Sequence, residues 1–212
     1  MIHLLIKNNI FVDSNFVFDY KLMAINNPFP LIDNSWTLFL DRDGVINSFE
    51  KGKTIGSIKD FNFIEGSIEG IVMATQIFGR IIVVTNQQGI FSNEIDATDL
   101  EKIHFYIQDC VKAKKGKIDA IYYCPYPSKW NPRCRKPNPG MAIWAKQDFP
   151  EIDFKKSIII GDSKTDMEFG ANLGMFKILI DNQEINESII QFDAKFNSLK
   201  EAISHMTRHW NN

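Results

Sequence analysis

The feature that most constrains the fold is a regular alternation, from Trp36 onward, of short apolar runs with longer amphipathic segments. Each run is nearly continuous in apolar residues, as is typical of a strand buried on both faces. Strands that alternate with helices imply right-handed crossovers between parallel strands. The sequence therefore predicts an α/β fold, a three-layer sandwich with a central parallel sheet. The predicted strands are TLFLD, RIIVVTN, IDAIYYC, KSIIIGD and FKILID.

The amphipathic segments predict helices on both faces of this sheet. In the first segment, IEGIVMATQIFG, Ser67 is placed to cap the helix and Gly79 to end it. The other predicted helices are ATDLEKIHFYIQDCVKAKKG, NPGMAIWAKQDF, KTDMEFGANLG and, near the C-terminus, SLKEAISHM.

One domain accounts for residues 36–212, because a chain of 212 residues suits a single core and no linker interrupts it. Residues 1–35 do not follow the alternation of strands and helices. We assign them to an N-terminal extension, either a small hairpin or an edge addition, whose role the sequence does not indicate.

The bulk composition indicates a cytoplasmic protein. The net charge of −2 gives no sign of a general nucleic-acid binder. The N-terminal stretch MIHLLIKNNIF is broken by Lys7 before a signal-peptide core could form, and no apolar run approaches the length of a membrane span. Three cysteines, an odd number, favour a reducing compartment and argue against a disulfide framework. We expect no nucleic-acid partner and no membrane, and a monomer is favoured.

Polar side chains follow four of the predicted strands, at the points where the strands end. The carboxyl ends of parallel strands meet at one edge of a sheet, where ligands bind in α/β folds. Convergence of four such groups is far less expected by chance than any one of them. The residues are Asp41 and Asp43, then Thr85 and Asn86, then Arg135 and Lys136, and finally Asp162 and Asp166.

The residue types match phosphoryl transfer from a phosphomonoester. This chemistry needs a nucleophile, a divalent cation and fixed donors for the phosphoryl oxygens. Asp41 can attack phosphorus and form an aspartyl phosphate, while Asp43 can act as general acid and base. Magnesium prefers hard oxygen ligands, which Asp41 and Asp162 could provide. The remaining donors are the Thr85 hydroxyl, the Asn86 amide and the Lys136 ammonium group.

Four motifs in order, DRDGVIN, TNQQGI, CRKPNPGM and GDSKTDM, resemble those of the haloacid dehalogenase (HAD) superfamily phosphatases. The Arg between the two aspartates, the Asn-Gln after the threonine and the Cys-Arg-Lys-Pro string are most similar to one branch of that superfamily. This branch contains the D-glycero-D-manno-heptose 1,7-bisphosphate phosphatases and the histidinol-phosphate phosphatases. The resemblance covers about residues 36 to 180.

The resemblance implies an Mg²⁺-dependent phosphatase that removes the 7-phosphate of a heptose 1,7-bisphosphate, with histidinol phosphate as the alternative substrate. It implies that Asp41 is the nucleophile and Asp43 the acid and base. The implied phosphate-holding residues are Thr85 and Lys136, the implied magnesium ligands are Asp41, Asp162 and the backbone carbonyl of Asp43, and the implied substrate contacts are Asn86, Gln87 and Arg135.

Spacing argues against a separate cap domain. Only 41 residues, 44 to 84, lie between Asp43 and Thr85, and a predicted helix and strand already occupy about half of them. The interval from Asn86 to Arg135 is filled by a helix, a strand and one loop. We therefore expect a site roofed only by loops.

The loop CPYPSKWNPRCRKP departs from the branch that the motifs resemble. Relatives hold a structural zinc there, but Tyr126 and Pro132 stand where a histidine and a cysteine are expected. Cys124 and Cys134 remain, and two thiolates do not complete a tetrahedral zinc site, so zinc is not expected. The cations of this loop could hold a second phosphate or simply be solvated; they are Lys129, Arg133 and Arg135.

Several alternatives stay open. Asp166 could be a surface residue that stabilises the helix dipole or a member of the metal shell. His104 and Cys110 are interpreted as packing residues. A phospho-accepting signalling domain also uses an aspartate, a threonine and a lysine in that order, although its acidic residues are distributed differently. The metal-binding Asp-x-Asp of sugar-nucleotide transferases does not explain GDSKTD or Lys136.

Overall fold

The computed structural model describes residues 11–13, 16–18, 29–50, 52–181 and 190–210, and the chain divides into two compact units, Met1–Pro30 and Leu31–Asn212. In the first unit, strands β1 (Phe11–Asp13) and β2 (Phe16–Phe18) pair antiparallel, with Phe11 opposite Phe18. The rest of the segment for which a hairpin or edge addition was predicted lies largely outside the described residues. The division of the chain at residue 36 stays a prediction.

The second unit is built on a six-stranded sheet in which every neighbouring pair is parallel. The strand order is β5-β4-β3-β6-β7-β8, so the first strand of this unit lies at the centre. This arrangement confirms the predicted α/β fold. The strands are β3 (Thr37–Leu40), β4 (Arg80–Asn86), β5 (Ala120–Cys124), β6 (Ser157–Gly161), β7 (Phe176–Ile180) and β8 (Ala194–Phe196).

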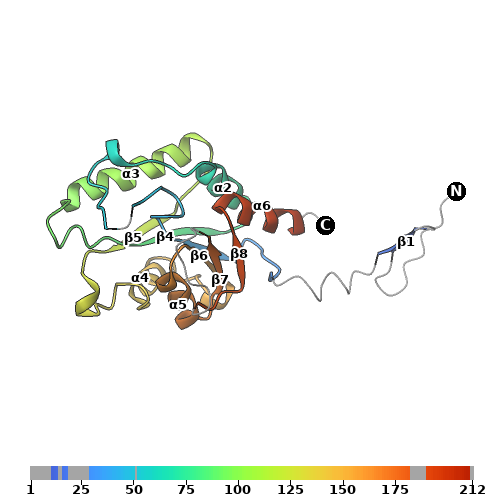
Figure 1. The fold of residues 1–212 in the computed structure, drawn as a ribbon. Helices are drawn as coiled ribbons and strands as arrows, with labels where there is room; N and C mark the ends of the chain where they lie inside the picture. The colour runs from blue at the N-terminus through green and yellow to red at the C-terminus, as the bar shows by residue number, and fades with distance from the viewer. Residues whose placement is uncertain (1–10, 14–15, 19–28, 51, 182–189, 211–212) are drawn as a thin grey trace. The chain divides into compact units, whose positions relative to one another are not determined.

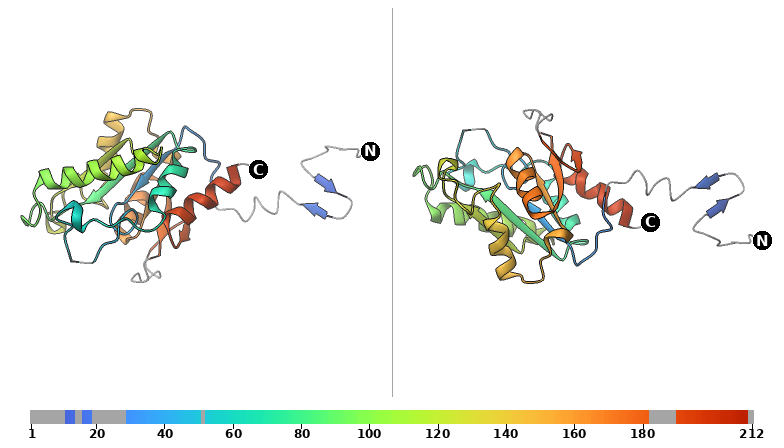
Figure 2. Two further views of the ribbon diagram at one scale, coloured as in Figure 1. Left: turned by 90° about the horizontal axis from the view of Figure 1, so that it is seen from above. Right: turned by 90° about the horizontal axis from the view of Figure 1, so that it is seen from below.

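Helices cover both faces of the sheet, as the alternation predicts (Figure 1). Figure 2 shows α2, α3 and α6 over one face and α4 and α5 over the other. The three layers of the predicted sandwich are therefore present. The helices are α2 (Ser67–Ala74), α3 (Ala97–Ala113), α4 (Gly140–Asp148), α5 (Lys164–Leu173) and α6 (Leu199–Trp210).

The boundaries of α2 differ from those predicted. The N-cap residue is Gly66, with φ of +80°, and Ser67 is the first residue of the helix, with its side chain buried. The helix ends at Ala74 rather than continuing to Gly79. Gly79 instead allows the backbone at Asn34 to come close, because a Cβ at position 79 would lie 2.0 Å from the carbonyl oxygen of Asn34. A helix-stop glycine and a close-approach glycine look alike in a sequence.

The register of the central strands positions the site. Leu40, the last residue of β3, lies beside Val83 of β4 and Ile160 of β6. The backbone N–H of Asp41 then donates to the carbonyl oxygen of Ile160 at 2.9 Å, which continues the ladder by one residue. Asp41 is therefore level with Val84 and Gly161, and Thr85 and Asp162 each come one residue further along the chain.

Besides the helices, the intervals between the strands hold loops and short 3-10 turns. They include η1 (Ile58–Asp60) before α2 and η2 (Ser128–Trp130) after β5. Across residues 29–50 and 52–181 no additional folded unit is inserted, in agreement with the absence of a separate cap domain. Within the described part of the chain, every helix is too short or too polar to cross a membrane.

Candidate active site

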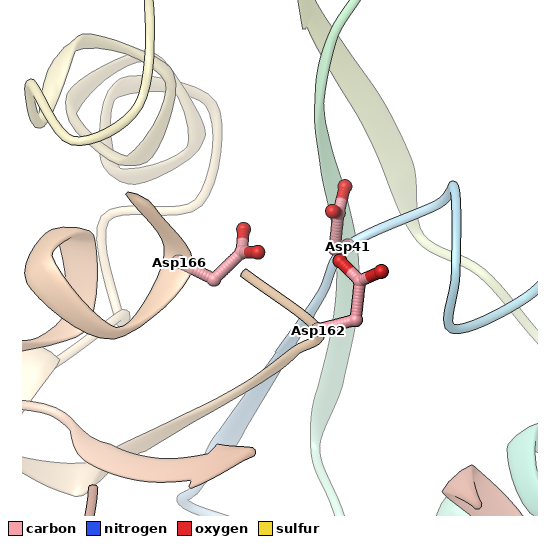
Figure 3. Close-up of side chains that lie close together, drawn as sticks. All are labelled: Asp41, Asp162 and Asp166. Carbon is pink, nitrogen blue, oxygen red and sulfur yellow. The ribbon is translucent and has the colours of Figure 1, made fainter. Parts of the chain in front are cut away.

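Three buried carboxylates meet at the carboxyl edge of the sheet. Asp41 follows β3, Asp162 follows β6 and Asp166 lies in the first turn of α5. One oxygen from each lies within 4.8 Å of the others, and Figure 3 shows Asp41 and Asp162 close together, with Asp166 facing them from α5. The sequence predicts this convergence for all three residues and leaves open whether Asp166 belongs to the metal shell or to the surface. Because Asp166 has no exposed surface, its interpretation as a surface residue is wrong.

Two glycines make room for these carboxylates. Gly44 has φ of +85°, and a Cβ on it would lie 1.9 Å from Oδ2 of Asp162. At Gly161 a Cβ would lie 2.2 Å from the Cβ of Asp166. Gly44 therefore meets two requirements of the DxDG turn at once, a left-handed backbone and close approach of a carboxylate.

Lys136 neutralises part of the negative charge in the cluster. Its Nζ lies 2.7 Å from Oδ1 of Asp41 and 2.5 Å from Oδ1 of Asp166. A third contact, at 2.9 Å, goes to the carbonyl oxygen of Val84. Burial alone would lower the pKa of Lys136, but the charges of Asp166 and Asp41 raise it above the usual value. The side chain is therefore a fixed cation.

The surroundings of Asp41 disfavour the ionised form of its carboxyl group. Burial, followed by the charges of Asp166 and Asp162, raises the pKa of Asp41 well above its usual value, although Lys136 acts in the opposite direction. A divalent cation among these oxygens would relieve the repulsion, and three buried carboxylates are hard ligands of the kind that Mg²⁺ prefers. The residues present therefore fit the predicted magnesium site.

Asp43 is held by a different set of partners. Arg42 donates to both of its oxygens, from Nη2 at 2.8 and 2.9 Å. Asn47 adds a hydrogen bond of 2.9 Å and Gln87 one of 2.7 Å. Burial alone would raise the pKa of Asp43, but the charge of Arg42 and these hydrogen bonds lower it below its usual value. The Asp43 side chain is not part of the three-carboxylate cluster, so only its backbone carbonyl is left for the metal role that the resemblance implies.

Gln87 joins Asp43 to Thr85. Its Nε2 donates to Oδ2 of Asp43 and to Oγ1 of Thr85, each at 2.7 Å. Both amide protons are thereby used, and the side chain is buried. In the structure Gln87 positions Asp43 and Thr85, and its expected contact with substrate stays a prediction.

Asn86 fixes the segment that carries the lysine. Its Nδ2 donates to the carbonyl oxygen of Lys136 at 3.3 Å, and its Oδ1 accepts from the Lys136 N–H at 3.1 Å. Arg135, in the same segment, donates from Nη1 to the carbonyl oxygen of Tyr126 at 2.9 Å. The two predicted substrate contacts therefore both anchor the loop after β5.

His104 was interpreted as a packing residue, and the structure gives it a polar contact as well. Its Nε2 lies 3.5 Å from Nη1 of Arg42, and its ring centroid lies 5.8 Å from that of Tyr123. Burial and the positive charge of Arg42 lower the pKa of His104 to about 3. The imidazole is therefore neutral and accepts from Arg42. No periodicity in the sequence distinguishes this histidine from an ordinary core residue of α3.

The loop after β5 contains a disulfide between Cys124 and Cys134. This differs from the expectation that the chain has no disulfide. The reason is geometric, since the loop folds back and brings the two Cα atoms to 5.3 Å, a separation typical of disulfides. The odd cysteine is Cys110 on α3, which is free. The expectation that this loop does not bind zinc stays a prediction from the sequence.

Comparison with known proteins places this arrangement in a family. The model of the HAD-hydrolase-like family matches residues 133–202. A D-glycero-alpha-D-manno-heptose-1,7-bisphosphate 7-phosphatase of Campylobacter jejuni is 36% identical over 170 residues, which cover 79% of this chain and 93% of that protein. A D-glycero-D-manno-heptose-1,7-bisphosphate 7-phosphatase of Chlorobaculum tepidum is 32% identical over 171 residues, 76% of this chain and 85% of that protein.

Solved structures show the same fold. The D,D-heptose 1,7-bisphosphate phosphatase of B. bronchiseptica, solved with magnesium and phosphate, matches with a TM-score of 0.75 at 24% identity, over 82% of this chain and 99% of that one. The corresponding enzyme of Burkholderia thailandensis matches with a TM-score of 0.59 at 24% identity, over 81% and 98%. The sequence relatives and the fold agree with the motifs, and the chain belongs to the HAD superfamily phosphatases, in the branch of the heptose-1,7-bisphosphate 7-phosphatases.

Proposed function

We propose that the chain is an Mg²⁺-dependent phosphatase that removes the 7-phosphate of D-glycero-D-manno-heptose 1,7-bisphosphate. The observation that carries the proposal is the meeting of Asp41, Asp162 and Lys136 at one edge of the sheet. The names of the relatives supply the substrate. Because those relatives are enzymes, the phospho-accepting signalling domain considered from the sequence is set aside.

The reaction proceeds in two displacements. A carboxylate oxygen of Asp41 forms a bond to phosphorus while the bond from phosphorus to the sugar oxygen breaks, and protonated Asp43 gives its proton to that oxygen. Asp43 then takes a proton from a water molecule whose oxygen attacks phosphorus. The bond to Asp41 breaks and inorganic phosphate leaves. The lowered pKa of Asp43 favours the ionised form that the second displacement requires, whereas the first requires Asp43 to take up a proton against this shift.

The other site residues bind the phosphoryl group and the metal. Because the Thr85 hydroxyl accepts a hydrogen bond from Gln87, its own proton is left for a phosphoryl oxygen. Lys136 contributes a positive charge beside the nucleophile. Asp41 and Asp162 would hold Mg²⁺, with Asp166 as a further carboxylate in reach. When bound, the ion neutralises negative charge on the phosphoryl oxygens.

Replacement of the nucleophile tests the proposal. We expect Asp41→Asn to lower phosphate release from heptose 1,7-bisphosphate on the order of 10⁴-fold or more, because an amide cannot form the phosphoenzyme. The matched control is Asp109→Asn, the same change on an exposed residue of α3, which should leave turnover unchanged. Turnover and thermal unfolding are measured for both variants.

Two results would contradict the proposal. Undiminished turnover in Asp41→Asn, with the fold intact, would exclude Asp41 as the nucleophile. A wild-type kcat/KM for histidinol phosphate above that for heptose 1,7-bisphosphate would move the substrate to the alternative weighed from the sequence. The cytoplasmic location and the monomeric state stay predictions from the sequence, to be checked by cell fractionation and by light scattering.

A further inference from the structure

Three exposed aromatic rings contact one another on two loops that leave the carboxyl edge of the sheet. Phe91 follows β4, and Tyr126 and Trp130 follow β5. The ring centroids of Phe91 and Trp130 lie 4.4 Å apart, edge to face, and those of Tyr126 and Trp130 lie 6.1 Å apart. The three residues are between 42% and 54% exposed. We call them the aromatic cluster.

Short stretches of chain connect the aromatic cluster to the active site. Phe91 comes four residues after Gln87, which binds Asp43, so the two Cα atoms are at most about 14 Å apart. The carbonyl oxygen of Tyr126 accepts from Arg135, the residue directly before Lys136. These two connections keep the aromatic cluster within a short length of chain from Gln87 and Lys136.

The loop that carries two of these rings is tied down at several points. Asn138 donates from Nδ2 to Oδ1 of Asn131 at 2.8 Å and to the carbonyl oxygen of Pro132 at 2.9 Å. The disulfide between Cys124 and Cys134 closes the base of the loop. Rings held in this way lose little conformational freedom when a ligand packs on them, which favours binding.

The chemistry of the reaction says what such a surface could bind. The phosphoryl group must reach Asp41, so the rest of the substrate extends outward past the loops that roof the site. A sugar ring has one face rich in C–H bonds, and these carry a slight positive charge that suits the negative face of an aromatic ring.

We propose that the aromatic cluster is a subsite that binds the sugar ring of the substrate, with Trp130 at its centre. The inference rests on the proposed function, since it concerns the sugar whose phosphate is removed. According to this inference, the enzyme prefers a sugar to a small acyclic leaving group because the sugar packs on Phe91, Tyr126 and Trp130. These residues bind; they take no part in bond breaking.

The test compares two substrates in Trp130→Ala. We expect KM for heptose 1,7-bisphosphate to rise about 3- to 10-fold with little change in kcat, because ring contacts of modest strength are lost in binding. Acetyl phosphate has no ring, and its kcat/KM should be unchanged. Trp130→Phe keeps an aromatic face and should recover most of the lost affinity. Phe105→Ala removes a ring that is 65% exposed on α3 and should change neither substrate.

The outcomes separate the inference from the proposed function. An unchanged KM for the sugar in Trp130→Ala, or an equal loss with both substrates, overturns the inference and leaves the phosphatase assignment standing. Failure of the wild-type protein to release phosphate from heptose 1,7-bisphosphate overturns both. If Trp130→Ala does not fold, Phe91→Ala on the other loop applies the same comparison, with the same expected rise in KM.

Discussion

Gln87 determines where two catalytic side chains point. Its amide donates one hydrogen bond to Asp43 and one to Thr85, so one side chain contacts both groups. A buried hydrogen bond to a charged group contributes more than an ordinary one, and losing it leaves Asp43 with only Arg42 and Asn47 as side-chain partners. The orientation of the acid and base therefore depends on a residue that transfers no proton itself.

We expect Gln87→Leu to lower kcat about 10- to 100-fold, the loss that corresponds to one or two hydrogen bonds of this kind. The neighbouring Gln88 is exposed, so Gln88→Leu is the matched control and should leave kcat unchanged. Steady-state kinetics with heptose 1,7-bisphosphate checks both. A kcat for Gln87→Leu equal to that of the wild type would show that Arg42 and Asn47 position Asp43 without help.

His104 makes the stability of the fold depend on pH. Its pKa is about 3 in the folded protein and 6.5 as an ordinary histidine, so the unfolded chain takes up a proton that the folded one excludes. The stabilisation is complete above pH 6.5 and is lost progressively as the pH falls toward 3. Through this group, the free energy of unfolding should fall by about 2 kcal/mol between pH 7 and pH 5.

Urea unfolding of the wild type and of His104→Gln at the two pH values isolates this contribution. Glutamine does not titrate and can still accept from Arg42, so the variant should lose less stability on acidification. Equal losses in the two proteins would mean that His104 is protonated in the fold.

At the scale of the elements, the turn after β3 depends on Gly44. An alanine there would place its methyl group on the Asp162 carboxylate and hold the backbone in the left-handed region. We expect Gly44→Ala to lower kcat/KM at least about 100-fold, because a displacement of about 1 Å in a catalytic group is enough for such a loss.

Gly52→Ala is a close control for this change. Gly52 has the same φ of +85°, but a Cβ on it would meet nothing within 4 Å. The control therefore carries the backbone cost, about 1–2 kcal/mol, without the clash. If both variants lose activity equally, backbone strain rather than the position of Asp162 is the cause.

The elements also show why prediction from sequence succeeds and where it stops. Five strands were predicted because each is an apolar run that stands out from its surroundings. β8 was missed because it has only three residues, Ala194–Phe196, with Lys195 in the middle, and lies at the edge of the sheet. Its existence depends on pairing with β7, which a local pattern does not report.

For the site, sequence reasoning located the residues that follow strand ends, since parallel strands bring such residues together. It did not find the hydrogen-bonding roles of Gln87 and His104, because these depend on how side chains from β4, α3 and the turn after β3 meet in space. The disulfide was missed for the same reason, since the separation of two cysteines across a loop is a property of the fold.

For the molecule as a whole, the sheet, its covering helices and the site residues all belong to the unit Leu31–Asn212. We expect a chain that begins at Leu31 to keep the kcat/KM and the melting temperature of the full-length protein. Kinetics and thermal unfolding of the two chains check this. A marked loss of either quantity would assign a role in catalysis or stability to residues 1–30.

Three oxygens surround Lys136 Nζ: it forms ion pairs with Asp41 and Asp166 and a hydrogen bond to the carbonyl oxygen of Val84. An arriving phosphoryl oxygen must therefore compete for one of these positions. Where it displaces Asp41, the exchange that binds the substrate also removes Lys136 from Oδ1 of Asp41, which keeps the hydrogen bond from the Arg42 N–H. The enzyme would then keep its nucleophile occupied for as long as there is nothing to attack.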